Sequence, residues 1–262
     1  STSMKLIIIK FTAFLILTTL SSCGIDMLNR IEGNNNVISI KRDINEDFTK
    51  VKVSTGIELI IDQGNEVSLT LEADENLHDI IITEVEDGKL KIYTEKNIWR
   101  SASKKVYLTV NTLEELKASS GSNVITTNVL KATDLHIGSS SGARLTLEVT
   151  AVNLTCTTSS GASTNLDVNA KSVVSSSSSG SNMKIKGKTT NHETSASSGS
   201  SINAYNLLSK NVTTKVSSGA SISVHASESI DGKASSGGSI SFEGNPEKII
   251  RKTSSGGSIS GS

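Results

Sequence analysis

The chain has 262 residues with 26 basic and 26 acidic side chains, and 3% of its residues are aromatic. The balanced charge and the lack of a basic block argue against a nucleic-acid binder, because phosphate recognition needs clustered Lys and Arg. With so few aromatic side chains, the core must be built largely from Val, Ile, Leu and Thr, which favour β-strands.

The first residues predict an export signal. A basic start at Met4-Lys5 is followed by an apolar stretch from Leu6 to Leu20, which is too short for a confident membrane span. Leu20-Ser21-Ser22-Cys23 matches the bacterial lipobox: an aliphatic residue, two small residues beside the scissile bond, and a thiol that takes diacylglycerol. Residues 1–22 are therefore predicted to be a signal peptide, with residues 1–3 an addition or misplaced start before Met4.

The lipobox predicts that Cys23 is the lipid attachment site and that the protein sits in the outer membrane, on its periplasmic face or at the cell surface. The alternative is an ordinary signal peptide with a chance cysteine. Cys156 is the other cysteine of the chain. It lies in an alternating apolar pattern, which predicts a small buried side chain and not a nucleophile.

Residues 23–36 have little pattern and predict a lipid-anchored tether. Residues 37–118 are more charged but strand-like, and are predicted to form an irregular N-terminal β cap over the open edge of a repeat array in the second half. Within this region, Glu86-Asp87-Gly88-Lys89 predicts a type I′ hairpin. Ser54-Thr55-Gly56 resembles a degenerate form of the triplet that dominates the second half.

Residues 119–262 are organised by a Ser-Ser-Gly triplet that recurs every 18 to 21 residues. Glycine accepts the positive φ of a tight corner, and the neighbouring hydroxyls could cap turn amides or bond to the next coil. A serine-lined stripe that binds a ligand is the functional alternative. The triplets end at Gly121, Gly142, Gly161, Gly180, Gly199, Gly219, Gly237 and Gly256.

Apolar residues follow the triplet in phase, at alternate positions that share one face of a strand. Three positions after each glycine stand Val124, Leu145, Thr164, Met183, Ile202, Ile222, Ile240 and Ile259. Two positions further stand Thr126, Leu147, Leu166, Ile185, Ala204, Val224 and Phe242. Seven positions before a glycine stand Leu135, Leu154, Val173, His192, Val212, Ile230 and Ile249. Each repeat is thus predicted to hold two short strands and turns.

A repeat of about 19 residues, rich in Gly and Ser, is too short for a helix pair and suits one coil of a β-solenoid. The stacked coils would form continuous parallel sheets. The chain stops inside a repeat, at Ser254–Ser262, and the uncovered edge predicts self-association.

Together these patterns resemble the putative auto-transporter adhesin "head GIN" domain family, common among Bacteroidetes. The resemblance is carried by Phe48–Ile57, Gln63-Gly64, Glu72–Leu77, Val85–Leu90 and the Ser-Ser-Gly repeats. It implies a right-handed parallel β-helix, a single-stranded solenoid similar to the pectate-lyase-like superfamily, with a role in adhesion.

Polysaccharide lyases and hydrolases also use β-helices, so an enzyme has to be weighed. Glycosidic chemistry needs paired carboxylates, and the acids here are interpreted as scattered over different repeat positions. His192 and Glu193 are the most tempting pair, but neighbours on a strand point to opposite faces. The acids are Asp134, Glu148, Asp167, Glu193, Glu228, Asp231, Glu243 and Glu247.

Other site chemistries find little support, and we predict no catalytic, cofactor-binding or metal-binding residues. His78, His136, His192 and His225 lack ligand spacing. Ser-Ser-Gly lacks the setting of a nucleophile elbow. Tyr205 and Phe242 are the aromatic residues of the repeats, which disfavours a sugar platform built by stacking. Trp99 is interpreted as a partly buried residue of the cap, and the alternative is an exposed contact in a loop.

Two function classes remain. The favoured one is a non-enzymatic, lipid-anchored envelope protein that serves as an adhesin or interaction module for an unknown protein or glycan. The alternative is a divergent polysaccharide-active β-helix.

Overall fold

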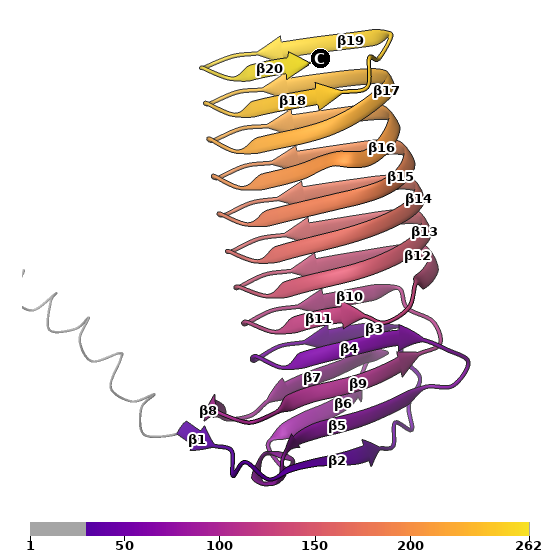
Figure 1. Cartoon of the computed structure of the whole chain (residues 1–262), viewed down its shortest axis with the longest axis vertical. Helices are drawn as coiled ribbons and strands as arrows, with labels where there is room; N and C mark the ends of the chain where they lie inside the picture. Colours follow the sequence, from indigo (N-terminus) through magenta and orange to yellow (C-terminus); the bar gives the residue numbers. More distant parts are fainter. Residues whose placement is uncertain (1–29, 262) are drawn as a thin grey trace, which may run out of the picture.

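The computed structural model describes residues 30–261, so the predicted signal peptide and Cys23 lie outside the described residues. The fold is a β-solenoid, as predicted (Figure 1). None of the helices in the described part of the chain has the length and apolar character needed to cross a bilayer.

The N-terminal strands lead into longer ones that wind up the rod. The first elements are β1 (Arg30–Glu32), β2 (Val37–Arg42), β3 (Lys50–Val53), β4 (Glu58–Gln63), β5 (Ser68–Asp74), the 3-10 helix η1 (Glu75–Leu77), β6 (Ile81–Glu86), β7 (Lys89–Thr94), β8 (Asn97–Arg100), β9 (Lys104–Val110), β10 (Glu115–Ala118) and β11 (Asn123–Thr126). The rest are β12 (Leu130–Ser139), β13 (Arg144–Thr158), β14 (Ser163–Ser177), β15 (Asn182–Ala196), β16 (Ser201–Val216), β17 (Ser221–Ala234), β18 (Ser239–Glu243), β19 (Lys248–Thr253) and β20 (Ser258–Gly261).

From β12 onward each coil pairs in parallel with the next, and Arg144 of β13 stands opposite Ser163 of β14. The two short strands predicted for each repeat merge into one bent strand of 14 to 16 residues in β13 to β17. Between β13 and β14 the coil rounds its wide bend with the ladder almost unbroken, since only Val152 and Lys171 lack a partner there. The tight turns align along the opposite edge (Figure 1). The right-handedness of the coil stays a prediction.

The Ser-Ser-Gly turns share one backbone conformation. The eight glycines have φ between 66° and 78°, and the serine before each of them has φ between 48° and 53°. Two consecutive left-handed residues define a type I′ turn. The coils are linked here by backbone groups, since the amide of Gly142 donates to the carbonyl of Ser160 at 3.1 Å, and every other triplet glycine up to Gly237 makes the same bond to the next turn.

The hydroxyl groups that bond to the turn and to the neighbouring coil belong to the residue after the triplet glycine. The triplet serines were predicted for this role, and this position was not. Ser181, which follows Gly180, is fully buried. Its Oγ is 2.7 Å from the carbonyl oxygen of Ser178 and 2.9 Å from that of Thr158 on the preceding coil. Alanine takes this place in other coils, so the position requires a small side chain more than a hydroxyl.

The inward columns are largely confirmed. In the first column, the residues from Val124 to Ile240 are at most 2% exposed. The polar exception, Thr164, is also buried, and its hydroxyl bonds to Ser139 and Thr158 at 2.7 and 2.9 Å. Ile249 departs from the pattern with 45% exposure, because the described part of the chain stacks only β17 against its strand.

The stack begins earlier in the chain than Gly121. Thr55 and Gly56 have φ of 58° and 70°, so the degenerate triplet forms the same turn and joins β3 to β4 as a full coil. This coil lies between β7 and β9 on one side and β10 and β11 on the other, all in parallel. Spatial order therefore departs from sequence order at this end.

Antiparallel strands finish the N-terminal end of the stack. β5 pairs antiparallel with both β9 and β2, and β6 forms an antiparallel hairpin with β7. Asp87 and Gly88 close that hairpin with φ of 51° and 73°, which confirms the type I′ prediction. In Figure 1 these strands cover the lower end of the rod.

Part of the segment interpreted as a tether is folded. Arg30–Glu32 forms β1, which pairs in parallel with β8, and the amide of Asn35 donates to the carboxylate of Asp74 at 2.9 Å. The run of asparagines that looked unpatterned is therefore held by contacts with residues about 40 positions away, which no local pattern reveals.

Candidate functional site

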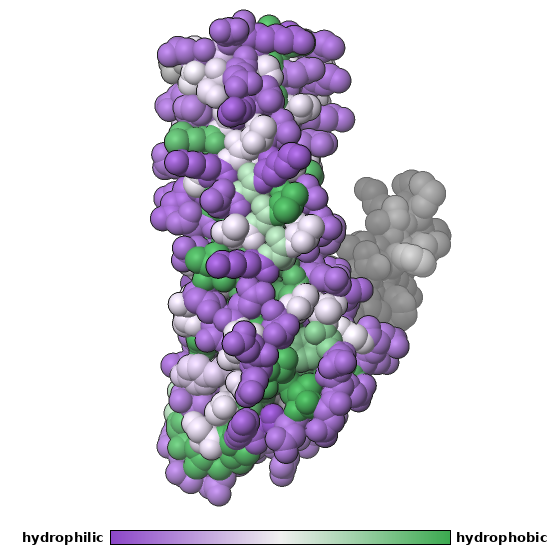
Figure 2. Space-filling model, turned by 90° about the vertical axis from the view of Figure 1, so that its right-hand side faces the viewer, coloured by the Kyte–Doolittle hydropathy of each residue, from purple (hydrophilic) through white to green (hydrophobic). Residues whose placement is uncertain are grey.

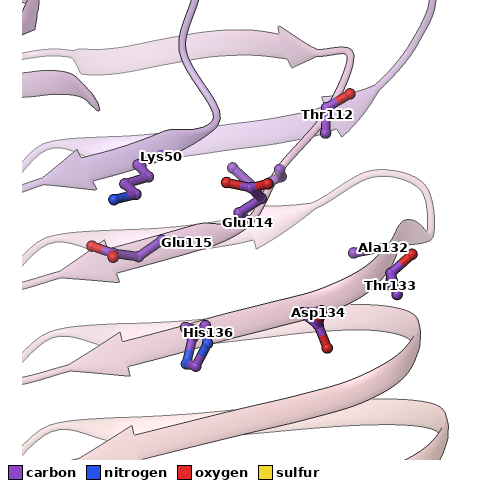
Figure 3. Close-up of a pocket in the computed structure, with 9 residues that line it drawn as sticks. Lys50, Thr112, Glu114, Glu115, Ala132, Thr133, Asp134 and His136 are labelled. Atoms are coloured by element: carbon purple, nitrogen blue, oxygen red, sulfur yellow. The ribbon is translucent and has the colours of Figure 1, made fainter. Parts of the chain in front are cut away.

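A groove of about 540 Å³ lies where the out-of-order coil meets the regular stack. Lys50, Glu115 and His136 occupy the same rung on three adjacent strands, β3, β10 and β12. Asp134 lies two residues before His136 on β12 (Figure 3). Glu114 completes a lining that places three carboxylates beside a lysine and a histidine.

The acids of this groove are engaged in structural contacts. Glu115 accepts ion pairs from Lys89 and Lys117, both at 3.3 Å. Burial raises the pKa of Glu115, but these two lysines outweigh it and hold the pKa below its ordinary value. Glu114 accepts a hydrogen bond from Thr49 at 2.9 Å. A carboxylate kept ionised in this way is a poor general acid, and the groove is better suited to bind a polar ligand.

A second groove, of about 410 Å³, opens on the opposite strand segment of the coils. Glu148 and Asp167 stand directly opposite each other on β13 and β14, six residues after their glycines. The interpretation that the acids form no column was therefore wrong at this pair. Lys186 continues the column and lies 3.4 Å from Asp167.

His192 and Glu193 lie on opposite faces of β15, as predicted. Glu193 is exposed, whereas His192 is 1% exposed inside the solenoid. The imidazole Nε2 of His192 is 2.9 Å from the hydroxyl of Ser175, which donates to Thr194 at 2.8 Å. This serine–histidine contact is sealed in the core, so it stabilises a buried polar group and gives substrate no access.

Burial also lowers the pKa of His192, to about 4. Below the ordinary histidine pKa of about 6.5 the unfolded chain binds a proton that the folded protein refuses, so stability falls as the pH drops from about 6.5 to about 4. We predict that the free energy of unfolding of His192→Val, measured by urea titration, falls between pH 7 and pH 5 by about 2 kcal/mol less than that of the wild type. Equal pH dependence in both proteins would contradict a buried neutral imidazole.

Cys156 is fully buried, and burial raises the pKa of its thiol to about 12. This agrees with its interpretation as a small core residue, since nucleophilic attack requires an accessible thiolate. Within residues 30–261 no group of three or more His, Cys, Asp or Glu side chains is placed to hold a metal ion.

Polar ladders run along the outside of the rod at the wide bend. The amide of Asn153 donates to Asp134 at 2.7 Å, and the hydroxyl of Ser229 donates to Asn211 at 2.8 Å. Asn191 joins the same column through Asn211 at 3.3 Å. This column was not predicted. Asn153 and Asn191 each stand eleven residues after a triplet glycine, and this shared offset would have placed these two side chains in one column.

The family model described as putative auto-transporter adhesin, head GIN domain, matches residues 47–167 and 149–246. The chain belongs to this family. No curated protein matches the chain.

Solved structures share the fold of this family member. A protein from Parabacteroides distasonis, described as a putative lipid binding protein, has 22% identity and a TM-score of 0.82 over 89% of this chain and 99% of its own. A putative adhesin from Parabacteroides merdae has 20% identity and a TM-score of 0.79 over 89% and 99%. A second Parabacteroides distasonis protein, a putative adhesin, has 19% identity and a TM-score of 0.82 over 89% and 100%.

Proposed function

We propose that the protein is a non-enzymatic cell-envelope lipoprotein, an adhesin or interaction module held in the outer membrane by a lipid on Cys23. The observation that carries the proposal is the repetition of outward polar columns from coil to coil, as in the Asn153 ladder. Repeat proteins use such extended surfaces for binding, because each coil presents the same position at a fixed spacing. Family membership supports adhesion, and the lipobox supports the anchor.

The anchor is tested by metabolic labelling with a palmitate analogue. We expect the wild type to incorporate the label and Cys23→Ala to lose it, because the thioether forms at that thiol. Protease treatment of intact cells then reports which membrane face carries the rod. A wild type without label, or a variant that retains it, would remove the lipoprotein part of the proposal.

A polysaccharide-active enzyme is the second candidate, and the Glu148–Asp167 pair is the observation that favours it. Retaining glycosidases hold two carboxyl groups about 5 Å apart, close to the spacing of neighbouring strands. Asp167, however, is paired with Lys186. Purified protein incubated with pectin-like polymers should leave their length unchanged. Turnover that disappears in Glu148→Gln would instead identify an enzyme.

A further inference from the structure

Trp99 is displayed on the two-stranded ribbon formed by β1 and β8. The side chain of Trp99 is 50% exposed, which corrects its interpretation as a partly buried cap residue. The guanidinium carbon of Arg100 lies 4.2 Å from the ring centroid and that of Arg30 lies 5.9 Å from it. Both distances are within the range of cation–π attraction. The two arginines outnumber Glu32, the one acid on these strands.

The ribbon is fixed to the rod, so the exposure of Trp99 is a feature of the fold. Ile31 and Ile98 pack against the core, and the amide of Gly33 donates to the carbonyl of Arg100 at 2.8 Å. The buried carboxylate of Asp74 then accepts the backbone amides of residues 35, 102 and 103, each at 2.9 Å. Both strand ends beyond Trp99 are thereby held in place.

Other exposed apolar side chains belong to the same N-terminal part of the molecule. Val37, Ile40, Val67 and Tyr107 are each 41 to 43% exposed, and all belong to the N-terminal strands and their loops. Figure 2, which looks at the side of the wide bends and therefore away from the β1–β8 ribbon, also shows hydrophobic surface at the lower, N-terminal end of the rod. Exposed apolar side chains in one part of a protein are typical of a surface that contacts another apolar phase.

The short length of chain between Cys23 and the ribbon indicates that this apolar phase is the lipid bilayer. Six residues separate Cys23 from Arg30. A fully extended chain of that length spans roughly 25 Å at most. An acyl group on Cys23 therefore keeps the ribbon close to the bilayer surface.

We propose that the β1–β8 ribbon is a bilayer-contact surface, in which Trp99 enters the headgroup region and Arg30 and Arg100 bind the phosphates of phospholipids. This proposal rests on the proposed acylation of Cys23. Tryptophan favours the membrane–water interface, and the guanidinium group matches phosphate oxygens while stacking on an aromatic ring. The rod then stands on its N-terminal end and presents its C-terminal coils away from the membrane.

Trp99 is the single tryptophan of the chain, so its fluorescence reports on this surface alone. The acylated full-length protein is reconstituted into phosphatidylcholine–phosphatidylglycerol vesicles, with and without lipids brominated along the acyl chains. We expect blue-shifted emission and at least twofold quenching by the brominated lipids. The matched control is Trp99→Phe combined with Leu208→Trp, because Leu208 is 48% exposed on β16, far up the rod (Figure 1). Its tryptophan should show no quenching.

The outcomes separate the surface from the anchor. Acylated protein with unquenched Trp99 overturns the contact surface and leaves the anchor standing. Equal quenching of Trp99 and of the Leu208→Trp reporter means that the rod lies flat, which also overturns the proposal. If palmitate labelling shows no acylation, the anchor fails, and the Cys23→Ser protein mixed with the same vesicles tests the surface by itself: quenching of Trp99 supports it and its absence overturns it.

Discussion

Gly187→Ala is expected to destabilise the solenoid by about 4 kcal/mol, because the new methyl group has no room and the backbone is strained. Gly187 has φ of 122°, and a Cβ there would lie 1.9 Å from the carbonyl oxygen of Val168 and 2.8 Å from its carbonyl carbon. Val168 is the partner of Gly187 on the neighbouring coil. Relief would require two stacked strands to separate, which breaks their hydrogen-bond ladder.

Gly180→Ala is the matched control on the same coil. Gly180 has φ of 66° in its tight turn, and a Cβ there would meet nothing within 4 Å. Alanine in the left-handed region costs about 1–2 kcal/mol, as the triplet serines already tolerate that region. The free energy of unfolding from urea titration should therefore fall far more for Gly187→Ala. Equal losses in the two variants would show that steric contact between coils does not set the effect.

Because stacked repeats can unfold in sections, amide hydrogen exchange should accompany the titration. We expect protection in Gly187→Ala to fall first in β14 and β15, the two strands that the methyl group separates. The strands of the N-terminal end should keep their protection. Uniform loss over the rod would indicate that the stack unfolds as one unit.

The regular part of the fold was predictable because each coil repeats one local rule. The distance from a triplet glycine places Leu145 or Ile222 in the core, and even the buried Thr164 obeys it. The same arithmetic would have found the Glu148–Asp167 pair. Where the position of a side chain depends only on its distance from the triplet glycine, the sequence is sufficient to predict that position.

The N-terminal end and its groove depend on pairings that no offset encodes. The coil of β3 and β4 is inserted between strands that follow it by about 40 and 65 residues. Lys50, Glu115 and His136 meet only because of that insertion. Trp99 likewise lies on a strand, β8, whose partner β1 belongs to a segment that was interpreted as a tether.

Asp74→Ala is expected to cost about 4 kcal/mol and to release the residues that hold the β1–β8 ribbon. The carboxylate of Asp74 is fully buried and accepts three backbone amides at 2.9 Å, from residues 35, 102 and 103. Hydrogen bonds to a charged acceptor are worth about 1.5–3 kcal/mol each, and their loss leaves buried donors unpaired. Asp134→Ala, which removes an exposed carboxylate with one amide donor, should cost less than about 1 kcal/mol.

The pH dependence of stability tests the contact between the Asp74 carboxylate and its backbone amides through the smaller substitution Asp74→Asn. Burial raises the pKa of Asp74, but the amides of Ser103, Asn35 and Ala102 outweigh it and hold the pKa below its ordinary value. The stabilisation is therefore present above the ordinary carboxylate pKa of about 4 and is lost as the pH falls through the folded-state pKa. In Asp74→Asn no proton is taken up, so urea titrations should show a shallower loss of stability below about pH 4 than in the wild type. Parallel pH profiles would mean that the charge of Asp74 does not hold the ribbon, and its amide contacts would have to act through shape alone.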